Sequence, residues 1–197
     1  MRFLSLRTTH ALAAVAAALL LATASADALQ SKKKGGDVFN GKARVTSGAA
    51  IADATFSIQI DQYTPEQDLK AMEQALKSGG SAAFVQALRK APVAGHFKTG
   101  DKTFPIRWAR QVDTPKGRVI SVVTDAPVYF VGAGLPGAAS REGFDVAVAQ
   151  MTIDSAGLGE GSMALAAKVK PGGQGGVEIQ DYATEPVKLV SIMRVIS

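Results

Sequence analysis

From Gly95 to the C-terminus, the sequence repeats one pattern: short stretches of alternating apolar and polar residues, separated by turns rich in Gly, Pro and Asp. Such alternation is typical of half-buried β-strands. Turns this short join antiparallel neighbours, because parallel neighbours need a crossover of helical size. The clearest hairpin joins residues 144–153 to 162–169 through a turn at 154–161. We therefore expect this part of the chain to form an antiparallel sheet.

The alternation also predicts which apolar side chains share a face of the sheet. Two segments are regular enough for this prediction: Phe104, Ile106 and Trp108 alternate with other residues in one, and Met163, Leu165, Ala167 and Val169 do so in the other. Because successive side chains of a strand point to opposite faces, each set is expected to lie on one side.

A helical segment follows the strand expected at residues 55–61. Thr64 is suited to cap a helix and Pro65 to occupy its first position. A glycine at Gly80 can end this helix, Ser81 can cap a second one, and Pro92 ends that second helix. The fold class is therefore α+β: an antiparallel β sandwich or partly closed barrel of about eight to ten strands, with one αα-hairpin inserted after the second strand.

The N-terminus has the pattern of a secretory signal peptide. A short basic head precedes the apolar and small residues 11–23, and alanines at alternate positions allow cleavage after Ala24, Ala26 or Ala28. We expect a signal peptide at 1–28, a flexible basic leader at 29–37 and a single β-rich domain at 38–197. The mature protein is then exported, periplasmic or extracellular, with no stable membrane span after processing.

Composition excludes several function classes. The chain contains no cysteine, which removes thiol nucleophiles, thiolate zinc sites and iron–sulfur clusters. Its formal net charge is +5, but part of this charge lies in the leader and the other basic residues alternate with acidic ones. A nucleic-acid surface needs clustered positive charge, so we expect no nucleic-acid partner. No cofactor is expected either.

Several segments together resemble a family of small exported bacterial proteins of uncharacterised function. They are residues 107–110 (RWAR), 124–125 (TD), 159–168 (GEGSMALAAK) and 178–189 (EIQDYATEPVKL). The resemblance covers nearly the whole mature domain and implies no activity, cofactor or catalytic residue. One departure is the glycine-rich segment 131–143, where similar proteins carry aromatic and charged residues.

Groups suited to catalysis are scarce. His96 is the one histidine that follows the leader, so a catalytic triad would have to use it. No serine has the spacing of a nucleophile elbow, and the glycines of 132–137 are not followed by the helix that a phosphate site needs. Asp154 and Glu160 flank a glycine-rich turn that is better explained as a hairpin loop than as a calcium site. We therefore assign no catalytic residue and no metal site.

Four residues are candidates for ligand binding: Trp108, Arg110, Tyr129 and Tyr182. Trp108 and Arg110 share a strand face at positions i and i+2, where they can line a pocket. The alternative is that the aromatic residues are core residues and the arginine is a solvated edge charge.

Two functions of different class follow. The first is a non-catalytic exported domain that binds a small apolar or amphipathic ligand, or an envelope protein. The alternative is a hydrolase that uses His96 or a carboxylate pair, such as Asp181 with Glu185 or Asp145 with Glu160.

Overall fold

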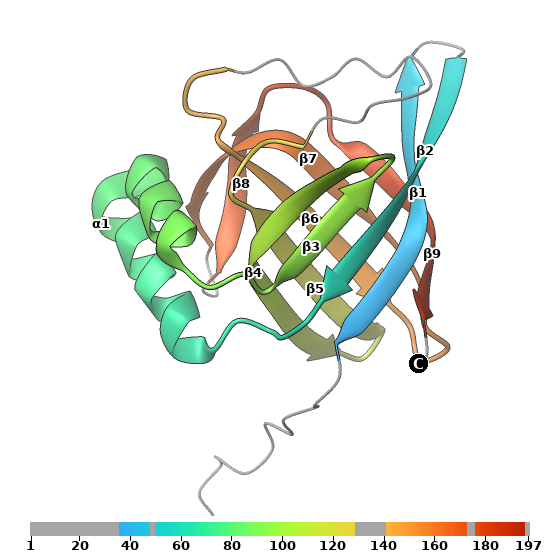
Figure 1. The fold of residues 1–197 in the computed structure, drawn as a ribbon, viewed down its shortest axis with the longest axis horizontal. Helices are drawn as coiled ribbons and strands as arrows, with labels where there is room; N and C mark the ends of the chain where they lie inside the picture. Colours follow the sequence, from blue (N-terminus) through green and yellow to red (C-terminus); the bar gives the residue numbers. More distant parts are fainter. Residues whose placement is uncertain (1–35, 48–49, 129–140, 173–175, 196–197) are drawn as a thin grey trace, which may run out of the picture. The chain divides into compact units, whose positions relative to one another are not determined.

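The computed structural model describes residues 36–47, 50–128, 141–172 and 176–195. This part of the chain forms one helix and nine strands (Figure 1). In chain order these are β1 (Asp37–Ser47), β2 (Ala50–Ile60), α1 (Glu66–Lys90), β3 (Gly95–Thr99), β4 (Lys102–Thr114), β5 (Gly117–Thr124), β6 (Val146–Ile153), β7 (Leu158–Pro171), β8 (Val177–Tyr182) and β9 (Val187–Val195). Among these residues, no helix combines the length and the apolar character needed to cross a membrane.

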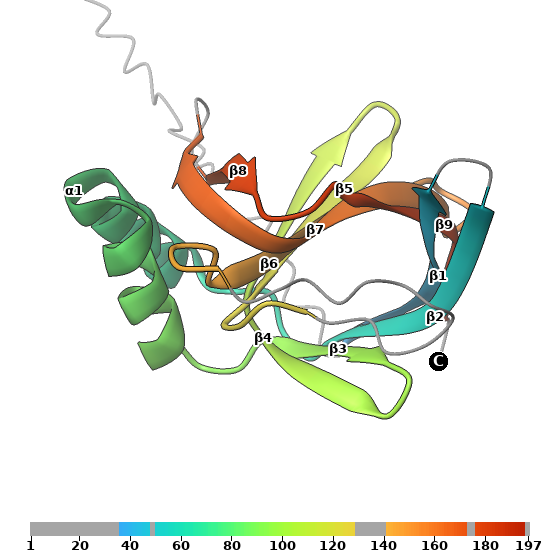
Figure 2. The same cartoon turned by 90° about the horizontal axis from the view of Figure 1, so that it is seen from above.

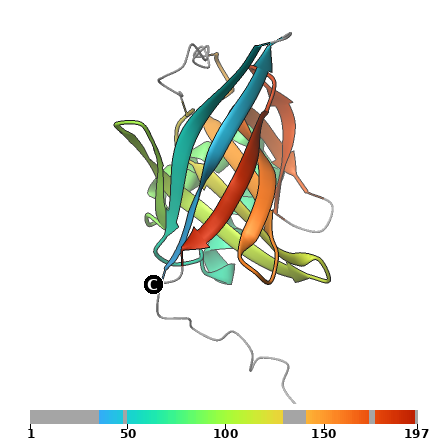
Figure 3. The ribbon, with the colours of Figure 1, turned by 90° about the vertical axis from the view of Figure 1, so that its right-hand side faces the viewer.

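The strands close into a barrel. Neighbours from β1 to β7 pair in sequence order, and β9 lies between β7 and β1, so that eight of the nine strands form a ring. Every pairing is antiparallel. Figure 3 shows the closure, with β9 in red beside β1 in blue. β8 pairs only with the second half of β7 and lies outside the ring. The expected antiparallel α+β architecture is confirmed, and the barrel is closed.

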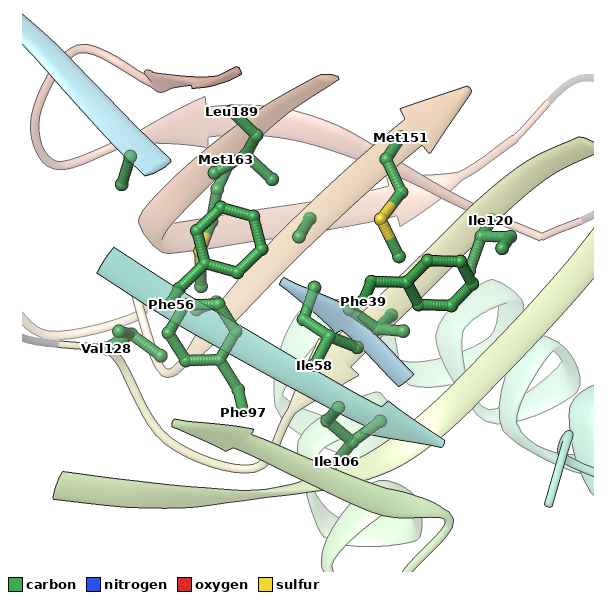
Figure 4. Close-up of a cluster of buried hydrophobic side chains, with 14 of the residues drawn as sticks. Phe39, Phe56, Ile58, Phe97, Ile106, Ile120, Val128, Met151, Met163 and Leu189 are labelled. Atoms are coloured by element: carbon green, nitrogen blue, oxygen red, sulfur yellow. The ribbon is translucent and has the colours of Figure 1, made fainter. Parts of the chain in front are cut away.

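The barrel is filled by apolar side chains that all its strands contribute. Phe39, Ile58 and Phe97 are completely buried there (Figure 4). The rings of Phe56 and Phe97 stack at 5.7 Å between centroids, and Val128, just after β5, is packed against the same cluster. An eight-stranded barrel is just wide enough for side chains to fill its interior.

Two β-bulges reverse the faces expected from the alternation. In β4 one extra residue lies between Ile106 and Trp108, so Ile106 points into the barrel while Trp108 points outward. In β7 the pairs with β6 shift between Ala164 and Ala167. The expectation that Phe104, Ile106 and Trp108 share a face is therefore wrong. So is the single face expected for β7, because Met163 and Leu165 point inward whereas Ala167 and Val169 point outward.

The helical segment differs from the expected hairpin. It is one helical element, α1, with non-helical backbone angles at Gly80 (φ 66°), so the two-helix hairpin is not confirmed. Thr64 is not the cap: its Oγ1 accepts a hydrogen bond from the Ala109 amide at 2.9 Å, and its own amide donates to the Ala109 carbonyl at 2.9 Å. The N-cap residue is Pro65, without a side-chain cap. Thr64 thus attaches the start of α1 to the bulged strand β4.

One outer side of the barrel is covered by α1 (Figure 2). Its buried residues, among them Leu76, Phe84 and Leu88, pack against outward-facing residues of the wall such as Trp108 and Val148. This second core accounts for the outward-facing apolar residues of β4, β6 and β7. On the opposite side of the barrel, β1 and β2 carry no helix (Figures 1 and 2).

A buried ionic cluster lies at the end of the barrel where β1 begins. The carboxylate of Asp37, 5% exposed, accepts hydrogen bonds from Arg194 Nε at 2.8 Å, from Tyr63 at 2.8 Å and from Arg118 at 3.3 Å, and it forms an ion pair with Arg194 Nη2 at 2.6 Å. Burial alone would raise the pKa of Asp37, but the hydrogen bonds and the two guanidinium charges outweigh it and lower the pKa. Burial and the bond to Asp37 raise the pKa of Tyr63. The cluster joins the first and the last strand of the barrel.

Candidate functional site

Trp108 belongs to the packed layer between α1 and the barrel wall. Its side chain is 1% exposed, and its ring meets that of Phe84 edge-on at 6.0 Å between centroids. Buried aromatic pairs of this geometry stabilise a core. Trp108 therefore reaches no open surface in the described state.

Arg110 and Tyr182 lie at opposite ends of the β8 segment. The guanidinium of Arg110 lies beside Gly176, just before β8: a Cβ at Gly176 would be 2.8 Å from its Nη1. Tyr182 is the last residue of β8 and is 40% exposed. Six residues of strand separate Gly176 from Tyr182, or about 20 Å. Tyr129 lies outside the described residues. The structure does not bring Trp108, Arg110 and Tyr182 together around one cavity, and their role in binding stays a prediction.

Arg107 makes a contact that the sequence did not indicate. Its Nε donates to Asp125 Oδ2 at 2.7 Å, and its Nη1 donates to the Ala91 carbonyl at 2.6 Å. Ala91 caps the C-terminus of α1, and Asp125 follows β5. Arg107 thus fixes the end of the helix to the barrel, which is a structural role.

His96 lies on the outward face of β3, opposite Gln59 of β2 and Pro105 of β4. Its Nδ1 is 4.0 Å from Asp61 Oδ2, longer than a hydrogen bond, and both side chains are nearly half exposed. Within the described residues, no hydroxyl group donates to the imidazole. The arrangement therefore lacks the nucleophile-to-base contact on which a triad depends.

Of the two carboxylate pairs considered for catalysis, Asp145 and Glu160 lie far apart. Glu160 pairs with Thr152 on β6, and Asp145 precedes that strand, so about seven residues or 23 Å of strand lie between the two carboxylates. Asp181 accepts the amide of Tyr182. Asp154 accepts two turn amides, those of Ala156 and Leu158, which confirms the hairpin-loop interpretation. Among the described residues, no group of three His, Cys, Asp or Glu side chains is placed to hold a metal ion.

An open hollow of about 330 Å³ lies on the barrel wall formed by β1, β2 and β3. It forms where β3 ends at Thr99: beyond this residue β2 has no partner on that side among the described residues, and Thr99 Oγ1 donates to the Thr55 carbonyl at 3.1 Å. The residues that line the hollow are Asn40, Gly41, Thr55, Phe56, Ser57, Lys98, Thr99 and Gly100. We call this set the β1–β3 hollow.

Three polar side chains of the β1–β3 hollow form one row across the strands. Asn40 pairs with Ser57, and Ser57 pairs with Lys98. In the part of the chain that the structure describes, none of the three side chains makes a hydrogen bond or an ion pair. Gly41 and Phe56 form the next pair and face the interior, where a Cβ at Gly41 would be 2.7 Å from the Phe56 ring. The outer face of the hollow therefore carries free donors in one row.

The sequence did not single out the β1–β3 hollow, because polar residues at alternate strand positions are the ordinary composition of an exposed sheet face. The hollow arises from strand lengths: β2 has 11 residues, whereas β3 has five.

The comparisons with known proteins assign no function to this hollow. No protein-family model matches the chain, and no curated protein and no solved structure shows significant similarity to it.

Proposed function

We propose that this chain is a non-catalytic exported binding protein that holds its ligand on the outer wall of a filled barrel. Support for a binding role comes from the β1–β3 hollow, where free polar side chains meet on a wall that no other described element covers. Support for export comes from the signal-like residues 1–28, which lie outside the described residues.

Packing argues against a ligand inside the barrel. Phe39, Ile58 and Phe97 are fully buried in its interior, and Met151 and Met163 are 1% exposed. A ligand that displaced any one of these side chains into water would forfeit about 1.5–3 kcal/mol of burial. The layer beneath α1 is filled in the same way. The packing therefore leaves no room for an apolar ligand between the sheet and the helix, and the outer wall is the better site.

A hydrolase remains the competing proposal, and it depends on His96. The 4.0 Å separation from Asp61 and the missing hydroxyl contact both weigh against it. If the protein hydrolysed a substrate through His96, His96→Ala would abolish turnover. For a binding protein, His96→Ala is expected to leave both the fold and ligand binding unchanged.

The test is native mass spectrometry of the full-length gene product, recovered under non-denaturing conditions from the exported fraction. We expect a co-purified small molecule on the wild-type protein, retained on the His96→Ala variant and chemically unchanged after incubation. Covalent cross-linking in the same fraction tests whether the partner is instead an envelope protein. Turnover of a co-purified molecule, abolished by His96→Ala, would refute a non-catalytic role.

A further inference from the structure

We infer that the β1–β3 hollow recognises a small polar molecule that carries an oxyanion, a carboxylate or a phosphate, next to hydroxyl groups. This inference rests on the proposed function and adds the chemical class of the ligand. It begins from charge: Lys98 is the one ionisable residue among those that line the hollow, and no carboxylate lines it. Asp101, in the adjoining β3–β4 turn, is exposed and is not part of the lining.

The available hydrogen-bonding groups favour an anion. A lysine ammonium has three donors and no acceptor, an asparagine amide adds two donors, and a serine hydroxyl adds one. Lys98, Asn40 and Ser57 supply these groups, and within the described residues their side chains bond to no protein group. Bonds from an ammonium to an ionised oxygen are shorter and stronger than neutral ones. A cation would find no balancing charge among the lining residues.

The spacing of the donors sets the size of the ligand. Neighbouring strands lie about 4.8 Å apart, so the row from Asn40 through Ser57 to Lys98 spans about 10 Å between backbones. A single sugar-sized ring fits this span, with its oxyanion at Lys98 and its hydroxyl groups at Ser57 and Asn40.

Three arginines of the barrel strands are already neutralised. Arg118 and Arg194 bind Asp37 at the end of the barrel, and Arg44 binds Asp53 through two bonds of 2.8 Å. Lys98 has no such internal partner in the described structure. The ligand class is therefore assigned to the β1–β3 hollow.

The test is an amide chemical-shift titration of the processed protein at constant ionic strength, with three probes: sodium glucuronate, glucose and inorganic phosphate. We expect glucuronate to shift the amides of residues 40–41, 55–57 and 98–100. Glucose should bind about tenfold more weakly, since it lacks the charged group. Phosphate should shift only the amides around Lys98. This result separates the contribution of the oxyanion to binding from that of the sugar ring.

Lys98→Gln keeps the length of the side chain and removes its charge, and it should weaken glucuronate binding about tenfold. Lys116→Gln, in the β4–β5 turn at the far end of β4, is the matched control and should change nothing. Equal binding of glucose and glucuronate, or an unaffected Lys98→Gln variant, would overturn the inference. Phosphate-induced shifts of equal size at Lys116 would also overturn it.

If a neutral molecule co-purifies and shifts residues of the hollow, the proposed function holds and the oxyanion inference fails. If no molecule co-purifies and no probe shifts these residues, both fail.

Discussion

Replacing Asp37 by Asn tests the role assigned to the ionic cluster at the barrel end. The substitution keeps the shape of the side chain and removes the charge that Arg118 and Arg194 share. Removing one partner of a buried ion pair costs about 3–5 kcal/mol. The two arginine side chains are 22% and 27% exposed, so water can solvate part of their charge after the substitution. We therefore expect a loss at or below the lower limit of this range, about 2–3 kcal/mol.

Thermal unfolding followed by circular dichroism measures this loss. In a domain of this size, about 2–3 kcal/mol corresponds to a fall in Tm of about 5–10 °C. Asp53→Asn is the matched control, because Asp53 also binds an arginine but does so at the surface, and it should lower Tm much less. If Asp37→Asn has the Tm of the wild type, the cluster does not stabilise the closure and the reasoning is refuted.

The pH dependence gives a second check on the same residue. The folded-state pKa of Asp37 lies below the ordinary carboxyl value of 3.8, so ionisation of Asp37 stabilises the fold fully above that value. This contribution is lost as pH falls below 3.8 and through the lower folded-state pKa. The difference in free energy of unfolding between the wild type and Asp37→Asn should be constant from about pH 5 to 7 and should shrink in acid. A difference that grows as the pH falls below 3.8 would contradict the assigned direction.

Two further predictions concern packing. Gly161→Ala places a Cβ against the Gln150 carbonyl of β6, so it should lower the free energy of unfolding in urea by at least about 3 kcal/mol. At Gly80 an added Cβ meets no atom. Gly80→Ala should therefore cost only about 1–2 kcal/mol, because of the positive φ at this residue. Similar urea midpoints for the two would show that the β6–β7 contact is not tight. Trp108→Ala removes the contact with Phe84, so it should lower the free energy of unfolding by about 3–5 kcal/mol. It should also speed amide exchange in α1 more than in the barrel. Unchanged exchange in α1 would contradict the packing of Trp108 against the helix.

Local features of the fold could be predicted because local chemistry determines them. The turn at Asp154 is an example: its carboxylate binds amides two and four residues onward. The sequence after Pro186 also predicts a last strand that starts at Val187, and β9 begins at this residue. In contrast, the bulges at Trp108 and in β7 cannot be read from alternation, because one extra residue reverses every later side chain of the strand.

Closure of the barrel depends on contacts between residues far apart in the sequence. Asp37 and Arg194 are separated by 157 positions, and nothing near either residue specifies the other. The same limit applies to the candidate site. His96 could be singled out by its type, but the β1–β3 hollow depends on β3 ending at Thr99 while β2 continues, which is a property of two strands together.

The central claim is that ligand binding takes place on the outer wall and not inside the barrel, and three methionines allow a direct test. Met193 pairs with Asn40 on the outer wall and is 57% exposed, whereas Met151 and Met163 are buried in the interior. The measurement is a methyl spectrum of the protein labelled with ¹³C-methionine, recorded while sodium glucuronate is added. We predict a shift of the Met193 signal with those of Met151 and Met163 unchanged. Saturable shifts of Met151 and Met163 with Met193 unaffected would place the ligand inside the barrel and contradict the claim.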